Sequence, residues 1–442
     1  MEVLYWEMRR LSMTDFENRW RQAQEKCDVY VMCSTLNQIV NYLPVENLKN
    51  RESKSLEIIN LSYEDGENKR FSNKMWDENF SSVYHHRYEE RPWIDSDDIK
   101  LPRRFKCEDY IRKIENCIED KKNKNFIWNV TGGQRNILFT AMKYIEDNAD
   151  TSSNHTVMYL EGNTQKITVG YYDTNEWKFG AVNNSYRSDT IDLHNLFRLA
   201  GYETDISDAV FIHEGKNEGD FLNLLKAYSN FYSKLYEVNE EVRKKLIESN
   251  KWNKKENNAN EFFKLLDGIN HKGKVTDDIE IIKESLNNRS NYLFGYFLEY
   301  MAAAVIWNAV QEISKPDADF FQSLSHSVKV YKNDWNGKEK FCELDLVLLL
   351  RSGQTVVFEC KSGFMSAENA KSREYTAYAL GGVYGKPILI TPLSEHEAVA
   401  GKMPDEYENI TKAYSSARRA GLEVFHLDTL KEDLKDLFKD AL

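Results

Sequence analysis

Hydrophobic and polar positions follow two periods along the first 200 residues. Short apolar runs indicate strands, and apolar positions three or four residues apart indicate helices. Several of these strands are followed by helical spacing, and the one ending at Val130 runs through a glycine turn into an amphipathic helix. This alternation is typical of a doubly wound α/β domain. The predicted strands cover residues 27–35, 55–63, 125–130, 155–162 and 166–173, the last two as a hairpin.

The middle of the chain has a different pattern. Residues 215–290 are rich in Asn, Lys and Glu, and the stretch 221–249 has helical spacing throughout. We see no convincing strand there, so these residues are predicted to be helical and to belong structurally with the second half. A long apolar helix is then predicted at 291–313.

The last third again alternates strands and helices, which predicts a second α/β domain. We therefore expect an α/β protein of two domains joined by a helical connector. The predicted parts are an exposed N-terminal arm at 1–24, a Rossmann-like domain at 25–200, a helical connector at 201–290 and a second α/β domain at 291–442.

Composition agrees with a globular protein of more than one core. The chain has 442 residues, of which 41% are hydrophobic and 29% charged. We find no apolar run of the ~18–20 residues that a membrane span needs, and no signal peptide. We therefore expect a cytoplasmic protein with no membrane partner. The six scattered cysteines predict reduced thiols rather than a zinc site.

The net charge of −12 argues against coating of duplex DNA through bulk charge. It leaves room for a local cationic groove.

The strongest chemical signal is the stretch ELDLVLLLRSGQTVVFECKSG at 343–363. Two apolar strands are joined by a turn at 351–354, so Asp345 should lie across from Glu359. Glu359 and Lys361 share one face because side chains alternate along a strand. Converging carboxylates favour Mg²⁺ or Mn²⁺, and a lysine beside them suits hydrolysis of a phosphodiester. The alternative is an edge salt bridge in which Lys361 merely neutralises Glu359.

On these residues, 291–430 resembles the PD-(D/E)xK restriction-endonuclease-like fold. The resemblance implies that Asp345 is the Asp of the motif and that Glu359, Cys360 and Lys361 form its ExK. It implies that Glu299, on the helix upstream, adds a carboxylate, so that the metal ligands would be Asp345, Glu359 and Glu299. A helix-surface role for Glu299 stays open. The sequence has no Pro before Asp345, and Glu343 fits a neighbour better than a ligand.

Two strand-to-helix turns in the first half suggest a ligand crevice. Backbone N–H groups at a helix start favour an anion, and glycine lets a ligand approach closely. The alternative is an ordinary tight turn, and there is no GxGxxG for a dinucleotide. The candidate ligand-binding residues are Ser34, Thr35, Asn37 and Gln38 in the first turn, and Thr131, Gly132, Gly133, Gln134 and Arg135 in the second.

These turns resemble those of the CRISPR-associated Rossmann-fold (CARF) sensor domain, although Gln134 replaces the final Thr of its late turn. Taken together, the two halves of the chain resemble the cyclic-oligoadenylate-activated nucleases of type III CRISPR defence. This resemblance implies a cyclic oligoadenylate as the activator, with cyclic tetraadenylate as the first candidate. It also implies Mn²⁺ or Mg²⁺ as the cofactor and a homodimer. The substrate stays open among RNA, single-stranded DNA and nicked duplex DNA. Groove candidates, each equally a solvated side chain, are Lys371, Arg373, Arg418 and Arg419.

Two other functions stay open. The chain fits a constitutive restriction or repair nuclease, and it fits a nucleotide-sensing regulator with an inactive nuclease fold. Cleavage without any small molecule would favour the former, and absence of metal-dependent cleavage the latter.

Overall fold

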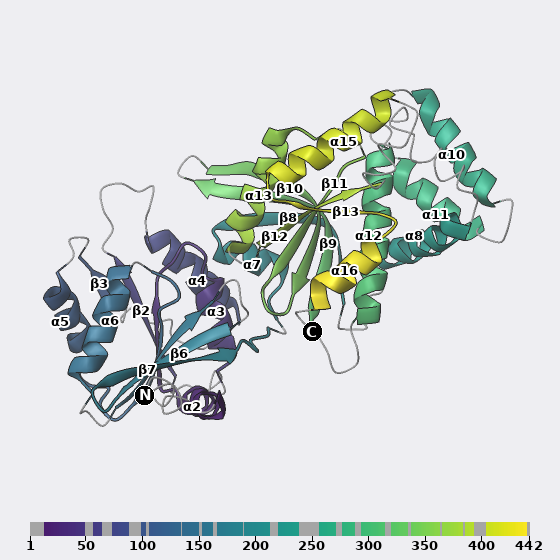
Figure 1. The fold of residues 1–442 in the computed structure, drawn as a ribbon. Coiled ribbons are helices and arrows are strands. Elements are labelled where there is room, and N and C mark those ends of the chain that lie inside the picture. The colour runs from purple at the N-terminus through teal and green to yellow at the C-terminus, as the bar shows by residue number, and fades with distance from the viewer. Residues whose placement is uncertain are drawn as a thin grey trace. The chain divides into compact units, whose positions relative to one another are not determined.

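The computed structural model divides into two compact units, Met1–Tyr202 with Gly382–Tyr384 and Glu203–Gly381 with Gly385–Leu442. Each unit is an α/β structure built on its own sheet (Figure 1). The predicted fold class is thus confirmed. The structure describes residues 13–48, 56–63, 73–87, 99–102, 106–133, 135–149, 153–161, 166–188, 190–212, 220–237, 256–270, 276–287, 293–313, 320–334, 337–362, 365–382, 385–392 and 404–439.

The first unit has a seven-stranded sheet with strand order β3-β2-β1-β4-β5-β6-β7. Strands β1 to β5 are parallel. Strands β5 and β6 form the predicted antiparallel hairpin, and β7 pairs antiparallel with β6. In chain order the unit contains α2 (Met13–Lys26), β1 (Val29–Cys33), α3 (Ile39–Glu46), β2 (Glu57–Tyr63), α4 (Asn73–Arg87), β3 (Ile99–Leu101), α5 (Cys107–Ile118), β4 (Asn125–Asn129), α6 (Arg135–Asp147), β5 (Asn154–Leu160), β6 (Lys166–Asp173), β7 (Glu176–Asn183) and α7 (Leu193–Leu199).

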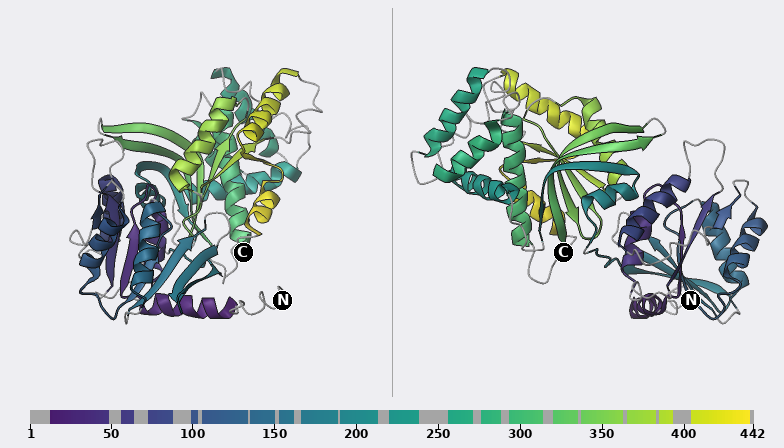
Figure 2. Two further views of the ribbon diagram at one scale, coloured as in Figure 1. Left: turned by 60° about the vertical axis from the view of Figure 1, so that its left-hand side comes forward. Right: turned by 180° about the vertical axis from the view of Figure 1, so that it is seen from behind.

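Helices cover both faces of this sheet (Figures 1 and 2). Helices α5 and α6 bury apolar side chains such as Ile114 and Ile137 against the residues of β1 and β4 that face them. On the opposite face lie α3 and α4, whose Tyr42 and Phe80 rings meet edge to face at 6.3 Å between centroids. The continuous apolar runs of β1 and β4 follow from burial on both faces.

Residues 13–24 are not the exposed helix or arm that the sequence predicted for 1–24, and residues 1–12 of that prediction lie outside the described residues. Helix α2 buries Phe16 and Trp20, four residues apart on one face. The Phe16 ring fills the space where a Cβ on Gly180 of β7 would stand, 2.5 Å away. The guanidinium of Arg19 lies 3.5 Å from the centroid of the Tyr171 ring on β6. Residues 13–26 are therefore an integral layer over β6 and β7.

We expect Trp20→Ala to lower the free energy of unfolding of the first unit by about 3 kcal/mol, as for a large aromatic removed from a packed site. The exposed neighbour Arg21→Ala is the control, with an expected change within ~0.5 kcal/mol. Urea unfolding followed by tryptophan fluorescence measures both. A loss below ~1 kcal/mol for Trp20→Ala would mean that α2 packs only loosely.

The second unit has a six-stranded sheet of order β13-β12-β11-β10-β9-β8. Strands β9, β10 and β11 are antiparallel neighbours, whereas β11, β12 and β13 run parallel. In chain order the unit contains β8 (Tyr202–Phe211), α8 (Asp220–Glu237), α10 (Glu256–Asn270), α11 (Thr276–Asn287), α12 (Leu293–Ile313), β9 (Phe321–Asp334), β10 (Gly337–Leu350), β11 (Thr355–Cys360), α13 (Ala367–Gly381), β12 (Gly385–Thr391), α15 (Pro404–Arg419), β13 (Glu423–His426) and α16 (Leu430–Lys439).

The stretch 201–290 differs from the predicted helical connector. Residues 202–211 form β8, the edge strand beside β9, and not a helix. The prediction failed here because Glu203, Asp205 and Asp208 break the apolar run that marks a strand. The helices α8, α10 and α11 are confirmed as helical, and their buried side chains join one core with α12 and the sheet. Figure 1 shows them gathered beside α12.

Helix α12 is the central core helix of this unit. Its 21 residues are long and apolar enough, by length and composition, for a membrane span, with a mean hydropathy of 1.4 in an 18-residue window. The prediction that no apolar run reaches the length of a membrane span was therefore wrong. In the structure α12 packs with the sheet, α8 and α16, and its apolar residues belong to the unit's main core. The opposite sheet face is covered by α13 and α15 through a smaller cluster around Leu389 and Ala413.

Candidate functional site

The nuclease-like residues meet where strands β10 and β11 separate. The last paired residues of this hairpin are Leu346 and Phe358. Just beyond this pair, the backbone N–H of Cys360 donates a 2.8 Å hydrogen bond to Oδ2 of Asp345. A side-chain carboxylate thus takes the place of the next backbone partner. The predicted register, with Asp345 across from the Glu359 end, agrees with this pairing.

Lys361 and Arg373 bring positive charge to the carboxylates. Lys361 Nζ lies 2.5 Å from Glu359 Oε1 and 3.9 Å from Asp345 Oδ2. Arg373, from α13, places Nε 2.8 Å from Glu359 Oε2 and donates from Nη1 to the carbonyl of Glu343 at 2.9 Å. Of the predicted groove residues, Arg373 therefore lies in the site itself. Lys371, Arg418 and Arg419 have exposed side chains.

Burial and neighbouring charges shift the pKa of Asp345 and of Lys361. Burial, with the facing Glu359 and then Glu299, raises the pKa of Asp345 to about 8, although Lys361 opposes this. Burial lowers the pKa of Lys361, but the Glu359 and Asp345 carboxylates outweigh it and the pKa is raised. Lys361 is therefore a protonated, charged group at neutral pH. Burial and the neighbouring carboxylates disfavour the charged form of Asp345.

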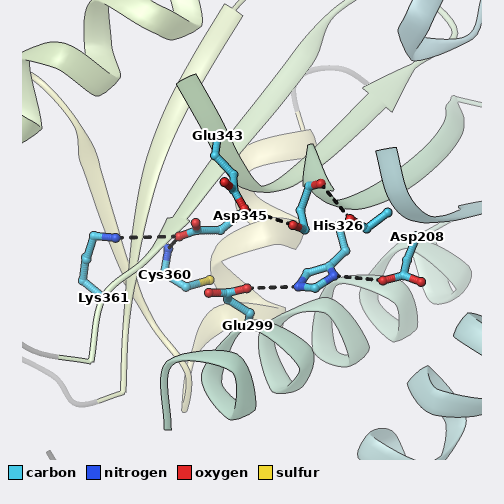
Figure 3. Close-up of polar contacts among 9 residues, drawn as sticks. Asp208, Glu299, His326, Glu343, Asp345, Cys360 and Lys361 are labelled. Atoms are coloured by element: carbon cyan, nitrogen blue, oxygen red, sulfur yellow. Dashed lines mark hydrogen bonds and ion pairs between the residues drawn. The ribbon is translucent and has the colours of Figure 1, made fainter. Parts of the chain in front are cut away.

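Glu299 approaches the same place from α12. Figure 3 shows Asp345 between Lys361 on one side and Glu299 on the other. Glu299 accepts a 3.0 Å hydrogen bond at Oε2 from Nε2 of His326, and the other ring nitrogen, Nδ1, lies 3.3 Å from Oδ2 of Asp208. Sequence reasoning missed both His326 and Asp208. Burial lowers the pKa of His326, but the two carboxylates raise it overall.

Glu343 lies beside this site without joining it. Its Oε2 is 2.7 Å from Lys340 Nζ and its Oε1 accepts from the Ser327 hydroxyl at 3.2 Å. The hydrogen bond from Lys340 lowers its pKa, against the effect of partial burial. A carboxylate already satisfied by its own lysine is a neighbour, as the sequence indicated.

The donor set can be compared with the needs of a divalent cation. Mg²⁺ and Mn²⁺ prefer carboxylate oxygens, which Asp345, Glu359 and Glu299 supply. Glu359 Oε2 is buried and has the Arg373 ion pair at 2.8 Å but no hydrogen bond among the described residues. No three ligating side chains of the described residues are already gathered at coordinating positions. The residue types fit a cation, and its binding would need these carboxylates to draw closer together than they lie here.

The raised pKa of Asp345 gives a pH prediction for the metal-free protein. A carboxyl whose pKa is raised on folding stabilises the fold below its unfolded pKa, near ~4, and this contribution is lost as pH rises through about 8. With a chelator present, the melting temperature of the wild type should therefore fall between about pH 5 and about pH 9 more steeply than that of Asp345→Asn. Parallel curves would show that Asp345 titrates as an ordinary carboxyl.

The predicted ligand crevice of the first unit lies at the carboxyl ends of β1 and β4. The strand order reverses between these two parallel neighbours, which is the usual ligand position in an open α/β sheet. The two turns touch: a Cβ on Gly132 would stand 2.8 Å from Cβ of Thr35. Gly133 has φ +82°, and a Cβ there would stand 2.6 Å from Cβ of Cys33. Both glycines are thus required by a close approach.

The polar side chains of the two turns divide into two groups. Gln38 is buried with its amide bonded to the Trp76 carbonyl and to Asn41, so it supports the fold. The Thr131 hydroxyl accepts from the Leu160 N–H at 2.8 Å.

The remaining residues of these turns are Ser34, Thr35, Asn37 and Arg135. The Ser34 hydroxyl is buried without a hydrogen-bond partner among the described residues, and Arg135 is exposed at the start of α6. The side-chain oxygen of Asn37 accepts from the Ile39 N–H at 3.1 Å. Gln134 lies outside the described residues.

Comparison with known proteins gives a fold relationship. No protein-family model and no curated protein matches the sequence. Among solved structures, protein VC1899 from Vibrio cholerae superposes with a TM-score of 0.58 at 15% identity, over 93% of this chain and 98% of that one. The two chains share a fold. At this identity the likeness says nothing further.

A second solved structure, a type III CRISPR defence DNA nuclease activated by cyclic oligoadenylate, has a TM-score of 0.42 at 11% identity. The match covers 83% of this chain but only 46% of that nuclease. A likeness at this level carries no argument about the residues above.

Proposed function

We propose that the chain is a metal-dependent nuclease switched on by a cyclic oligoadenylate. The observation that carries the nuclease part is the convergence of Asp345, Glu359 and Lys361 at the end of the β10–β11 pairing. It is supported by the resemblance of these residues to the PD-(D/E)xK motif. Three acids and a lysine around one buried point suit phosphodiester hydrolysis better than they suit an edge salt bridge.

Each residue has a distinct role in this proposal. Asp345 and Glu359, with Glu299, would hold Mg²⁺ or Mn²⁺, which supplies charge stabilisation at a phosphoryl oxygen. Lys361 keeps its proton at Nζ and presents a hydrogen-bond donor and a positive charge to the phosphodiester. Arg373 holds Glu359 and the Glu343 carbonyl in place.

The sensor part rests on the crevice at the β1–β4 turns and on its resemblance to CARF domains. The Thr131 N–H already donates to Asn129 Oδ1 at 3.0 Å, so the backbone N–H groups proposed for a phosphate are those of Gly132 and Gly133, just before α6. A ring with rotational symmetry is matched by two copies of one crevice across a two-fold axis, so we propose a homodimer. Calorimetry should then give one ring bound per two chains.

The nuclease activity is tested by incubating the purified protein with Mn²⁺, a panel of cyclic oligoadenylates, and labelled RNA, single-stranded DNA and duplex DNA. We expect cleavage of at least one substrate that a chelator abolishes. Cleavage that persists in a chelator would contradict the proposal. Absence of cleavage with every combination of ring and substrate would also contradict it. The identity of the cleaved strand decides among the three substrate classes.

A further inference from the structure

One buried histidine beside the candidate site has no part in the chemistry proposed above. His326 lies on β9 with its side chain fully buried. Its ring is held between aromatic neighbours, with centroids 4.6 Å from Tyr300 and 6.0 Å from Phe221. The ring nitrogens of a buried imidazole need hydrogen-bond partners, and aromatic neighbours supply none. The polar groups that meet these nitrogens therefore show how the side chain is held.

Both ring nitrogens of His326 are directed at carboxylates from other elements. Nε2 meets Glu299 on α12 at 3.0 Å, and Nδ1 meets Asp208 on the edge strand β8 at 3.3 Å. Figure 3 shows the three side chains in a row that ends beside Asp345. One carboxylate oxygen of Glu299 is therefore already bonded to His326, and this bond restricts the direction of the side chain.

The backbone around His326 is built to keep this geometry. The next residue, Ser327, has φ +50°, a left-handed conformation that is uncommon for a residue with a side chain. Its carbonyl accepts from the Ser207 hydroxyl of β8 at 3.3 Å, and its own hydroxyl donates to Glu343 on β10 at 3.2 Å. These contacts tie β8, β9 and β10 together at the level of the histidine.

We propose that His326 is a positioning residue that orients Glu299 toward Asp345, and that Asp208 in turn orients His326. This inference rests on the proposed function, because orientation of Glu299 matters only if its carboxylate helps to hold a divalent cation. Groups behind a ligating side chain fix its direction, and their loss weakens metal affinity by about 10–100-fold in known sites. The edge strand β8 is thereby part of the site.

The inference is tested on Asp208 rather than on His326, whose replacement would open a buried space and risk unfolding. Asp208→Ala removes the partner of Nδ1, whereas Asp208→Asn keeps an acceptor oxygen in the same place. Asp205→Ala is the matched control: this acid lies on the same strand with a 63% exposed side chain, 4.0 Å from Lys329. Mn²⁺ dissociation constants are measured by calorimetry on each full-length protein, with melting temperatures alongside.

We expect the Mn²⁺ dissociation constant to rise about 10-fold or more in Asp208→Ala, and to stay within about 2-fold of wild type in Asp208→Asn and Asp205→Ala. The Mn²⁺ concentration needed for half-maximal cleavage should move in parallel. Equal dissociation constants in Asp208→Ala and the wild type would overturn the inference and leave the proposed function standing. A wild type that binds no Mn²⁺ would overturn both.

Discussion

Replacing Asp345 by Asn is expected to lower Mn²⁺-dependent cleavage by at least about 10³-fold, or about 4 kcal/mol of transition-state stabilisation. The amide keeps the size of the side chain and an acceptor for the Cys360 N–H, so the hairpin should survive. It removes the carboxyl group that would give a cation a negatively charged ligand between Glu359 and Glu299. Glu359→Gln should have the same consequence, because Glu359 is the most buried acid of the site.

Glu343→Gln is the matched control for both substitutions. Glu343 lies two residues before Asp345 but is satisfied by Lys340 and Ser327. Its turnover should stay within about 3-fold of wild type, less than a kcal/mol. Initial rates at saturating Mn²⁺ and melting temperatures are measured together. Turnover near that of wild type in Asp345→Asn, with the fold intact, would contradict the assignment of the site.

The second large effect is expected in the first unit. Gly133→Glu should abolish activation by a cyclic oligoadenylate while leaving the metal site untouched. A Cβ at Gly133 would stand 2.6 Å from Cβ of Cys33, and the φ of +82° is unfavourable for any side chain. The new carboxylate would also repel an anionic ligand at the start of α6. Thr131→Ala should need far more ligand, since it loses the bond to the Leu160 N–H.

Lys143→Ala is the control on the same helix, since Lys143 is half exposed near the far end of α6 and pairs with Asp147. Cleavage is followed over a ligand titration for all three variants. Moving a switch from about 1% to about 99% active needs roughly 5.5 kcal/mol of differential affinity for the active state. A damaged crevice loses this differential affinity, so the cleavage rate should stay at its resting value as ligand is added. Wild-type activation curves in Gly133→Glu would show that the first unit is not the switch.

Short-range signals in the sequence were sufficient to predict that Asp345 and Glu359 lie together. The turn at 351–354, with Gly353 at φ +77°, sets the register of β10 against β11. Once that register is known, Asp345 and Glu359 must lie together. The glycine turn after β4 was predictable for the same reason, because strand, turn and helix follow one another directly.

The contacts of His326 could not be predicted in this way. A single histidine in an apolar strand has the pattern of an ordinary core residue. Its partners Glu299 and Asp208 are 27 and 118 positions away. Asp208 also lies in the acidic strand β8, which was predicted as helix. For the N-terminal helix, by contrast, the spacing of Phe16 and Trp20 was a usable signal of a buried face.

The account as a whole is tested most directly by one titration of the wild-type protein. Cleavage of labelled single-stranded DNA and RNA is measured in Mn²⁺ while the concentration of each cyclic oligoadenylate is raised from zero. We expect a low rate without ligand and a saturable rise of about 10²-fold with one ring size, as a two-state switch of this depth requires. A full rate in the absence of any ring would contradict ligand activation and favour a constitutive nuclease.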